Sequence, residues 1–216
     1  MLKLRPTSVR RSSLLTVLAV AVVAAVFVAP AAQAASCATR TLTSPFARFG
    51  DNNQYFLAPS GSFESGTAGW ALSNAAISSG NESFYLNRTT DKSSLKLTGS
   101  ALSPAFCITR DDPLLRFTAK TVKTAGASGN YSQLNVSIIV RNAAGSQGTY
   151  FLGAIQPQGN GSWFVLPQMH YGSLFDSYLF GSDGLGTANM QLQFTVAGQG
   201  GTWYLDDIYV DPFVGR

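Results

Sequence analysis

The stretch "WYLDDIYV", Trp203 to Val210, decides how the last strand of the fold is read. Its aromatic and branched side chains are typical of a β-strand, yet two carboxylates, Asp206 and Asp207, stand side by side in its middle. Adjacent residues of a strand point to opposite faces, so at least one of the two should face the core. A buried carboxylate without a partner is costly, and we therefore expect a partner close to this pair.

The first 35 residues have the pattern of a secretory signal peptide. A basic start, Lys3 to Arg11, precedes the apolar run Leu14 to Ala29, and small residues ending at Ala35 offer the cleavage site. The alternative is a membrane anchor. The apolar run is shorter than the ~20 residues that usually span a bilayer, which favours cleavage. We therefore expect a secreted, extracellular protein with no membrane span after cleavage.

The excess of positive charge belongs to this N-terminal segment. The chain has 15 Lys and Arg residues against 11 Asp and Glu residues, and four of the basic ones lie in residues 1–35. The rest of the chain is close to neutral. Nucleic-acid binding usually requires a clustered basic face, so we expect neither nucleic acid nor an anionic membrane as a partner. The remaining length fits one domain, and the sequence leaves its oligomeric state open.

Cys37 and Cys107 are the two cysteines of the chain. In an oxidising compartment they predict a disulfide. Such a bond would tie the N-terminal segment to the middle of the domain and stabilise the fold by about 4 kcal/mol on the chain-entropy model. The alternative is a lipid anchor on Cys37, because small residues precede it. Ala34 stands where a lipoprotein signal has a large aliphatic residue, and Cys107 would be left as a free thiol.

Residues 59–216 break into short apolar segments separated by Gly, Ser, Asn and Pro, with no long helical pattern. Regularly spaced short strands predict an all-β domain, an antiparallel two-sheet jelly-roll sandwich. Residues 36–58 are less regular but too aromatic for a free tail. We expect them to form an N-terminal strap that packs on the domain.

Two of the expected strands alternate clearly between apolar and polar residues. In "QLNVSIIV" the residues Leu134, Val136 and Ile138 share one face and Asn135 shares the other with Ser137. In "MQLQFTV", residues 190–196, the apolar residues likewise alternate with Gln and Thr. Such strands have one buried and one wet face, as in antiparallel sheets. In a jelly roll, the wet face is a common place for a shallow ligand groove.

The two ends of the predicted domain carry motifs of a known family. "GSFESGTAGW" at 61–70 and "GGTWYLDDIYVDP" at 200–212 resemble the ends of galactose-binding-like jelly rolls, in particular the carbohydrate-binding modules attached to xylanases and laminarinases. Ser60 and Ser62 depart from the Asn and Asp that the family often has there. The resemblance covers about residues 59–212. The chain also resembles uncharacterised secreted proteins of Gram-positive bacteria.

The resemblance implies a structural calcium ion where the first and last strands meet. Its carboxylate ligands would be Glu64 and one of Asp206 and Asp207, with backbone carbonyls completing the hard oxygen shell that Ca²⁺ requires. We favour Asp207, and a β-bulge would decide which side chain is aimed at the ion. The alternative is a hydrogen-bonded or salt-bridged pair without metal, with Arg116 or Arg88 as the partner.

The sequence shows no catalytic constellation, and we predict that the protein is not an enzyme. His170 is the only histidine, which excludes sites that need several. No G-x-S-x-G nucleophile elbow accompanies it, and no pair of acids can be assigned to glycoside hydrolysis from spacing.

Sugar sites need aromatic faces for stacking and side-chain amides for hydrogen bonds. Trp70, Trp163 and Trp203 are expected in the core. The better platform candidates are Tyr85, Tyr131, Tyr150, Tyr171 and Tyr178. The predicted ligand-binding surface consists of Tyr131, Asn135, Tyr150, Gln191 and Gln193.

These observations predict a secreted, non-catalytic module that binds a polysaccharide or cell-wall glycan and holds a structural calcium ion. The alternative is an extracellular structural or protein-interaction domain that keeps the fold without binding sugar. Nothing in the sequence names the glycan or the protein partner.

Overall fold

The computed structural model describes residues 37–123, 132–142, 144–158, 161–171, 186–198 and 201–212. The predicted signal peptide and the candidates Tyr131 and Tyr178 lie outside these residues. The elements are η1 (Ala47–Phe49), β1 (Phe56–Leu57), β2 (Ala71–Ser79), β3 (Ser93–Leu102), β4 (Phe106–Thr109), β5 (Leu114–Lys123), β6 (Gln133–Asn142), β7 (Gln147–Ile155), β8 (Trp163–Val165), β9 (Met169–His170), β10 (Thr187–Ala197) and β11 (Gly201–Asp211). Among the described residues, no helix is long and apolar enough to cross a membrane.

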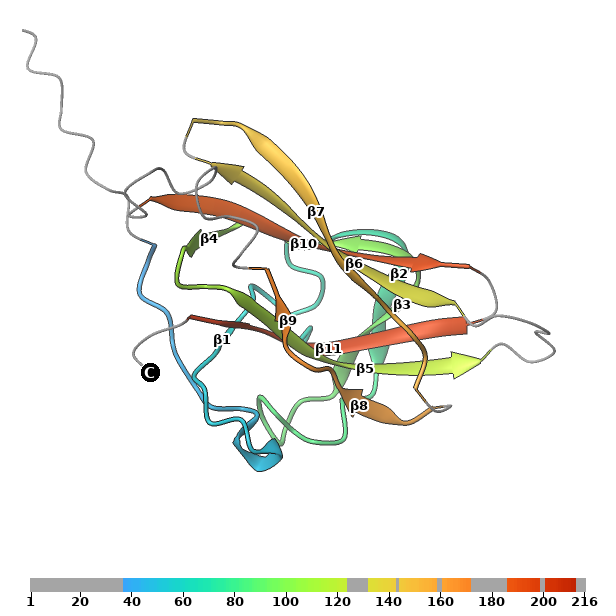
Figure 1. Cartoon of the computed structure of the whole chain (residues 1–216). Helices are drawn as coiled ribbons and strands as arrows, with labels where there is room; N and C mark the ends of the chain where they lie inside the picture. The colour runs from blue at the N-terminus through green and yellow to red at the C-terminus, as the bar shows by residue number, and fades with distance from the viewer. Residues whose placement is uncertain are drawn as a thin grey trace, which may run out of the picture. The chain divides into compact units, whose positions relative to one another are not determined.

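The strands form an antiparallel sheet that curls into two layers, which confirms the predicted all-β sandwich (Figure 1). One layer has the order β7-β6-β10, with β4 beside β10, and the other contains β11, β5, β8 and β9. Strand β3 belongs to both: Leu95 pairs with Leu205 of β11, and further along Ser100 pairs with Thr195 of β10. The layers are therefore joined by continuous hydrogen bonding as well as by the core.

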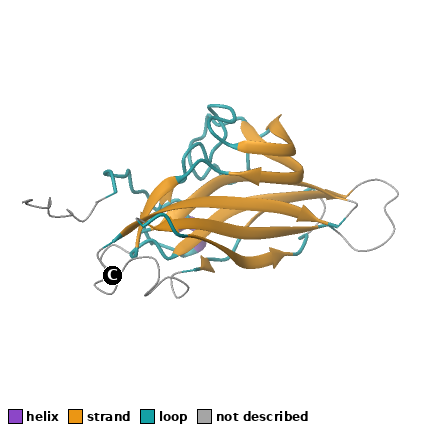
Figure 2. Ribbon diagram, turned by 90° about the horizontal axis from the view of Figure 1, so that it is seen from above, coloured by secondary structure: helices purple, strands orange, loops and turns teal. Residues whose placement is uncertain are grey.

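The core lies between the layers and follows the alternation of the sequence. Leu134, Val136 and Ile138 of β6 are fully buried, as are Leu192 and Phe194 of β10. Side chains from both layers meet in one hydrophobic cluster. Strands dominate the regular structure of the domain (Figure 2). Strands β6 and β10 pair in unbroken register from Ala188 to Ala197 of β10. Because alternate residues of each strand are buried in the core, the residues between them face outward.

The residues that precede Ala58 pack on the domain as an N-terminal strap. Strand β1 pairs with the end of β11, and Thr43 forms a β-bridge with Tyr55. Phe46 packs edge-to-face on Tyr55 and on Tyr209, with ring centroids 4.9 and 5.6 Å apart. These three rings form a second small core on the outer side of β11. That side of the layer is therefore covered.

The predicted disulfide is confirmed: Cys37 is bonded to Cys107 in β4, with their Cα atoms 5.5 Å apart. Next to it, the Arg40 guanidinium forms an ion pair of 2.6 Å with the buried Asp112. It also donates a hydrogen bond to the Cys107 carbonyl. A second partly buried ion pair joins Asp51 of the strap to Arg116 of β5. The strap is thus fixed to the domain by one covalent bond and two partly buried ion pairs.

Removing the disulfide should destabilise the domain. The Cys37→Ala/Cys107→Ala double variant is expected to lose up to about 4 kcal/mol of unfolding free energy, because the unfolded chain regains the freedom of a long loop. Urea denaturation of both proteins measures this. The Arg40–Asp112 pair and the β1–β11 pairing remain in the variant, so the fold should persist. Equal midpoints for the two proteins would contradict the expectation.

Candidate functional site

A β-bulge in β11 buries both aspartates of the DD pair. The pairing of β11 with β5 is regular up to Asp206, opposite Thr118, and resumes only at Tyr209, opposite Arg116. Asp207 lies within the bulge and has a left-handed backbone with φ of 48°. Both aspartates are completely buried. The expectation that at least one carboxylate faces inward is confirmed, and the bulge explains why the second is buried too.

The partner of the two carboxylates is the backbone of the loop between β2 and β3. The Glu82 N–H donates to Asp206 Oδ2 at 3.0 Å, and the Asn87 N–H donates to Asp207 Oδ2 at 3.1 Å. The Glu82 carboxylate accepts the N–H groups of Phe84 and Leu86, the latter at 2.6 Å. Residues 81–91 are therefore wound around three buried carboxyl groups.

The partners expected from the sequence lie elsewhere. Arg116 is paired with Asp51, and Arg88 is exposed. Glu64 is exposed and forms no hydrogen bond with either aspartate, since its Oε1 accepts the N–H groups of Lys92 and Ser93 at the start of β3, at 2.8 and 2.6 Å. The structure brings Glu82 to the aspartates in its place. Nothing in the sequence around Glu82 indicated this, because the contact spans more than a hundred residues.

The charged forms of this carboxyl cluster are disfavoured. Burial and the neighbouring Asp207 raise the pKa of Asp206 to about 9. Burial and the charge of Glu82 raise the pKa of Asp207 to about 8, and burial raises the pKa of Glu82. Asp91, also buried, adds a fourth carboxyl group and accepts a hydrogen bond from the Asn87 side chain. In the described part of the chain, no Arg or Lys forms an ion pair with any of the four.

The chemistry of the cluster fits a hard cation. Asp207 Oδ1 and Asn81 Oδ1 are buried oxygens without a hydrogen-bond partner, and oxygen ligands from carboxylates and amides are those that Ca²⁺ prefers. Over the described residues, however, no group of three or more His, Cys, Asp and Glu side chains is already arranged to hold a metal ion. The oxygens of the cluster that do have partners accept backbone N–H groups and the Asn87 side-chain amide.

A second candidate surface is the outward face of the layer β7-β6-β10. Asn135 and Gln193, both predicted, point outward there. In the sheet register Asn135 lies opposite Thr195, and Gln193 lies opposite Ser137. Gln191 also lies on this face, but its amide donates to the Ser103 carbonyl at 2.9 Å. Asn135 and Gln193 are thus diagonal neighbours whose side-chain amides form no hydrogen bond with any residue that the structure describes.

Tyr150, predicted as a platform for sugar, is partly buried. Tyr150 lies opposite Ile138 on the inward side of β7 and packs against the core. Gly148 makes room for it, since a Cβ there would lie 2.8 Å from the Tyr150 ring. The aromatic side chain that faces outward is the next one, Phe151, which is 60% exposed. The sequence does not reveal which of the two rings faces outward, because residues 150–152, "YFL", do not alternate between apolar and polar. A bulge in the β6–β7 pairing also interrupts the alternation of the two faces.

Phe151 pairs with Ser137, which in turn lies opposite Gln193. We call the set Phe151, Ser137, Gln193, Asn135 and Thr195 the Phe151 face. It combines one exposed ring with neutral hydrogen-bonding side chains. Tyr171, another platform candidate, is completely buried, whereas Tyr85 is exposed on the loop that surrounds Glu82.

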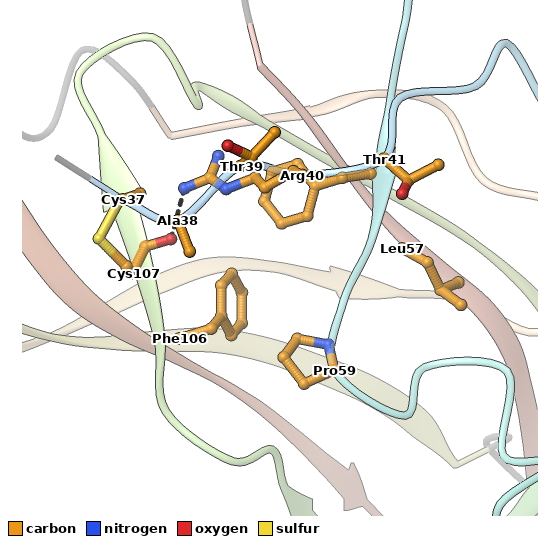
Figure 3. A pocket seen from close by; sticks show the side chains of 10 residues that line it. Cys37, Ala38, Thr39, Arg40, Thr41, Leu57, Pro59, Phe106 and Cys107 are labelled. Atoms are coloured by element: carbon orange, nitrogen blue, oxygen red, sulfur yellow. Dashed lines mark hydrogen bonds between the residues drawn. A yellow bond between two sulfur atoms is a disulfide. The ribbon is translucent and has the colours of Figure 1, made fainter.

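A pocket of about 380 Å³ lies between the strap and the domain, beside the disulfide (Figure 3). Its walls are mainly apolar, with Phe56, Pro59 and Phe106 among them. The Arg40 guanidinium lies 4.1 Å from the centre of the Phe56 ring, and its Nη1 and Nη2 groups donate to the Asp112 carboxylate and the Cys107 carbonyl. With few convergent polar groups left free, this pocket lacks the pattern of a specific binding site.

No protein-family model matches the chain, and no curated protein matches it. Solved structures similar to it include the module TmCBM61 in complex with β-1,4-galactotriose, at 12% identity over 72% of this chain and 97% of that chain, with a TM-score of 0.39. The CBM22-1 xylan-binding domain of Xyn10C from Paenibacillus barcinonensis is 19% identical over 72% of this chain and 93% of that one, with a TM-score of 0.42.

The family 11 carbohydrate-binding module of the cellulase Lic26A-Cel5E from Clostridium thermocellum is 16% identical over 73% of this chain and 94% of that one, with a TM-score of 0.40. All three are carbohydrate-binding modules, as the sequence resemblance implies. At these identities the likeness concerns the fold alone.

The carboxyl cluster predicts an unusual dependence of stability on pH. The pKa values of Asp206 and Asp207 lie near 9 and 8 in the folded chain, against an ordinary value of 3.8. Between about pH 4 and pH 9 the folded state therefore binds more protons than the unfolded state, and the unfolding free energy falls as pH rises. In EDTA, the protein should melt at a lower temperature at pH 8.5 than at pH 5.5. The Asp207→Asn variant, whose amide stays neutral, should reduce this difference. A melting temperature that stays constant or rises over this range would contradict the expectation.

Proposed function

We propose that this protein is a secreted, non-catalytic carbohydrate-binding module whose sugar site is the Phe151 face. The observation that carries the proposal is the position of Phe151, a 60% exposed ring on a mostly polar sheet surface. The C–H groups of a sugar ring can pack on such a face, as apolar groups do on aromatic rings. The side chains of Asn135 and Gln193 offer donors and acceptors to sugar hydroxyls.

The composition of the face favours a neutral glycan over an anionic one. Its outward side chains on β6, β7 and β10 are amides, hydroxyls and a few apolar groups, and the one charged residue among them, Arg141, donates to the Gln147 amide at 2.7 Å. A protein partner would bury a larger apolar area than one ring among polar groups provides. The disulfide supports secretion, because such bonds persist in oxidising compartments.

Binding should be tested by co-sedimentation of residues 36–216 with insoluble xylan, β-1,4-galactan and purified cell walls, competed by soluble oligosaccharides. We expect Phe151→Ala to weaken binding by about tenfold or more, since about 1.4 kcal/mol of lost contact corresponds to a factor of ten. The matched control is Val122→Ala, which removes another exposed apolar side chain, 38% exposed, from β5. Wild-type binding by Phe151→Ala, or no binding by a folded wild-type protein, would refute the site.

We also propose that a structural calcium ion is held by the carboxyl cluster. Asp207, Asp206 and Glu82 would hold it, and the ion would supply the positive charge that protons supply without it. The two buried oxygens without partners, on Asp207 and Asn81, support this proposal. It is independent of where sugar binds.

At pH 8, Ca²⁺ should raise the melting temperature relative to EDTA, because ligands that bind only the folded state stabilise it. Asp207→Asn and Glu82→Gln should abolish most of this rise. Glu64→Gln changes the ligand implied by the resemblance and should keep the rise in melting temperature. Glu64 is exposed, and its carboxylate accepts the backbone N–H groups at the start of β3. Identical melting curves with Ca²⁺ and with EDTA would show that the cluster holds no calcium.

A further inference from the structure

A polar pocket of about 520 Å³ lies on the covered layer of the sandwich. It is lined by the strap residues Phe49 to Asn53, by Arg116 of β5 and by Gln168 between β8 and β9. It shares no residue with the Phe151 face, which belongs to β6, β7 and β10. Its volume is within the usual range for small-molecule sites.

The inner wall of this pocket is a closed hydrogen-bond network. The Asp51 carboxylate accepts hydrogen bonds from the Tyr55 hydroxyl at 2.6 Å and the Gln168 amide at 3.0 Å. It also forms an ion pair with Arg116, whose guanidinium lies 4.3 Å from the centre of the Phe46 ring. The carboxylate and the guanidinium neutralise each other, so the wall does not select a charged ligand.

The outer side of the pocket offers free hydrogen-bonding groups. The side-chain amides of Asn52 and Asn53 form no hydrogen bond with any described residue, because only their backbone atoms are engaged. Each amide supplies two donors and one acceptor. Paired donors and acceptors of this kind match the hydroxyl groups of a sugar ring.

One exposed aromatic ring forms part of the pocket wall. Phe49, 41% exposed, lines it and packs edge-to-face on Phe84, with ring centroids 5.2 Å apart. Arg48 holds the two segments together by donating to the Phe84 carbonyl. The next residue, Tyr85, is 53% exposed. The pocket wall is thus joined, through Phe49, to the loop that carries Tyr85.

The backbone of Tyr85 is strained. Its φ is 53°, a left-handed conformation in which glycine is the relaxed residue. The loop is held in this state by the Glu82 carboxylate, which accepts the N–H groups on both sides of Tyr85. A large, exposed side chain at such a position does not serve packing. Strain of this kind is typical of functional sites.

We propose that this pocket and the adjoining loop with Phe84 and Tyr85 bind a second sugar unit of a neutral polysaccharide. We call the residues Phe49, Asn52, Asn53, Phe84 and Tyr85 the loop site. It takes the same class of ligand as the Phe151 face but stands independently of it. A polysaccharide that reaches both sites would bind more tightly than either site alone allows, because the second contact becomes intramolecular.

The test is isothermal titration of the mature protein with xylohexaose and with β-1,4-galactotriose, in wild type and variants. We expect two sites per wild-type chain and one site in Tyr85→Gly. Because glycine relaxes the left-handed backbone, Tyr85→Gly should melt at or above the wild-type temperature, so that lost binding is not lost folding. Tyr85→Phe keeps the ring and should restore the second site. Val122→Ala is the neutral control.

Asn53→Ala tests the polar side of the loop site and should weaken it at least about tenfold, while Phe151→Ala should leave it intact. Loss of binding in Tyr85→Gly alone, with Phe151→Ala unchanged, would support the loop site and refute the Phe151 face. The loop site is overturned if Tyr85→Gly and Asn53→Ala both keep the wild-type stoichiometry and affinity. It is also overturned if neither oligosaccharide binds the folded wild type.

Discussion

The carboxylates of β11 and the backbone N–H groups of residues 81–91 form the contact on which much of the structure depends. Asp206 and Asp207 can be buried together only because a bulge turns both toward the same loop, and the loop can pack there only because its N–H groups find acceptors. Glu82 then organises the loop from within. The interaction is therefore mutual: neither the bulged strand nor the loop would keep its conformation alone.

This contact makes the two layers of the sandwich different. The outer side of the β11–β5 layer is covered, by the loop on the carboxylates and by the strap on Tyr209. Among the described residues, the outward side chains of β6, β7 and β10 remain exposed or partly exposed. The open face of the sheet offers a flat surface made of strand side chains. The covered layer offers a recessed surface made of loop side chains. Both proposed sugar sites follow from this asymmetry.

The sequence predicted well what depends on local pattern. The antiparallel sandwich, the disulfide and the inward and outward sides of β6 and β10 all follow from alternation, turn residues and cysteine count. Features that depend on long-range contacts were beyond it. Glu82 lies beside the aspartates although 124 positions separate it from Asp206 in the sequence. Glu64, the ligand implied by the family resemblance, instead accepts backbone N–H groups at the start of β3. The orientation of Tyr150 and Phe151 depends on a bulge that the apolar run conceals.

The unbroken register of β6 and β10 has a consequence for how this surface can change. Every second residue of these strands is needed for the core, and the residues between them are not. The backbone therefore holds the outward positions on a fixed grid, about 4.8 Å apart between strands and close to 7 Å apart along each one. Substitutions at these positions can exchange the chemical groups on the grid without moving it. The inward residues of these strands thus determine folding, and the outward residues between them determine recognition. The outward residues can therefore change without altering the core, and the inward ones without altering the recognition surface.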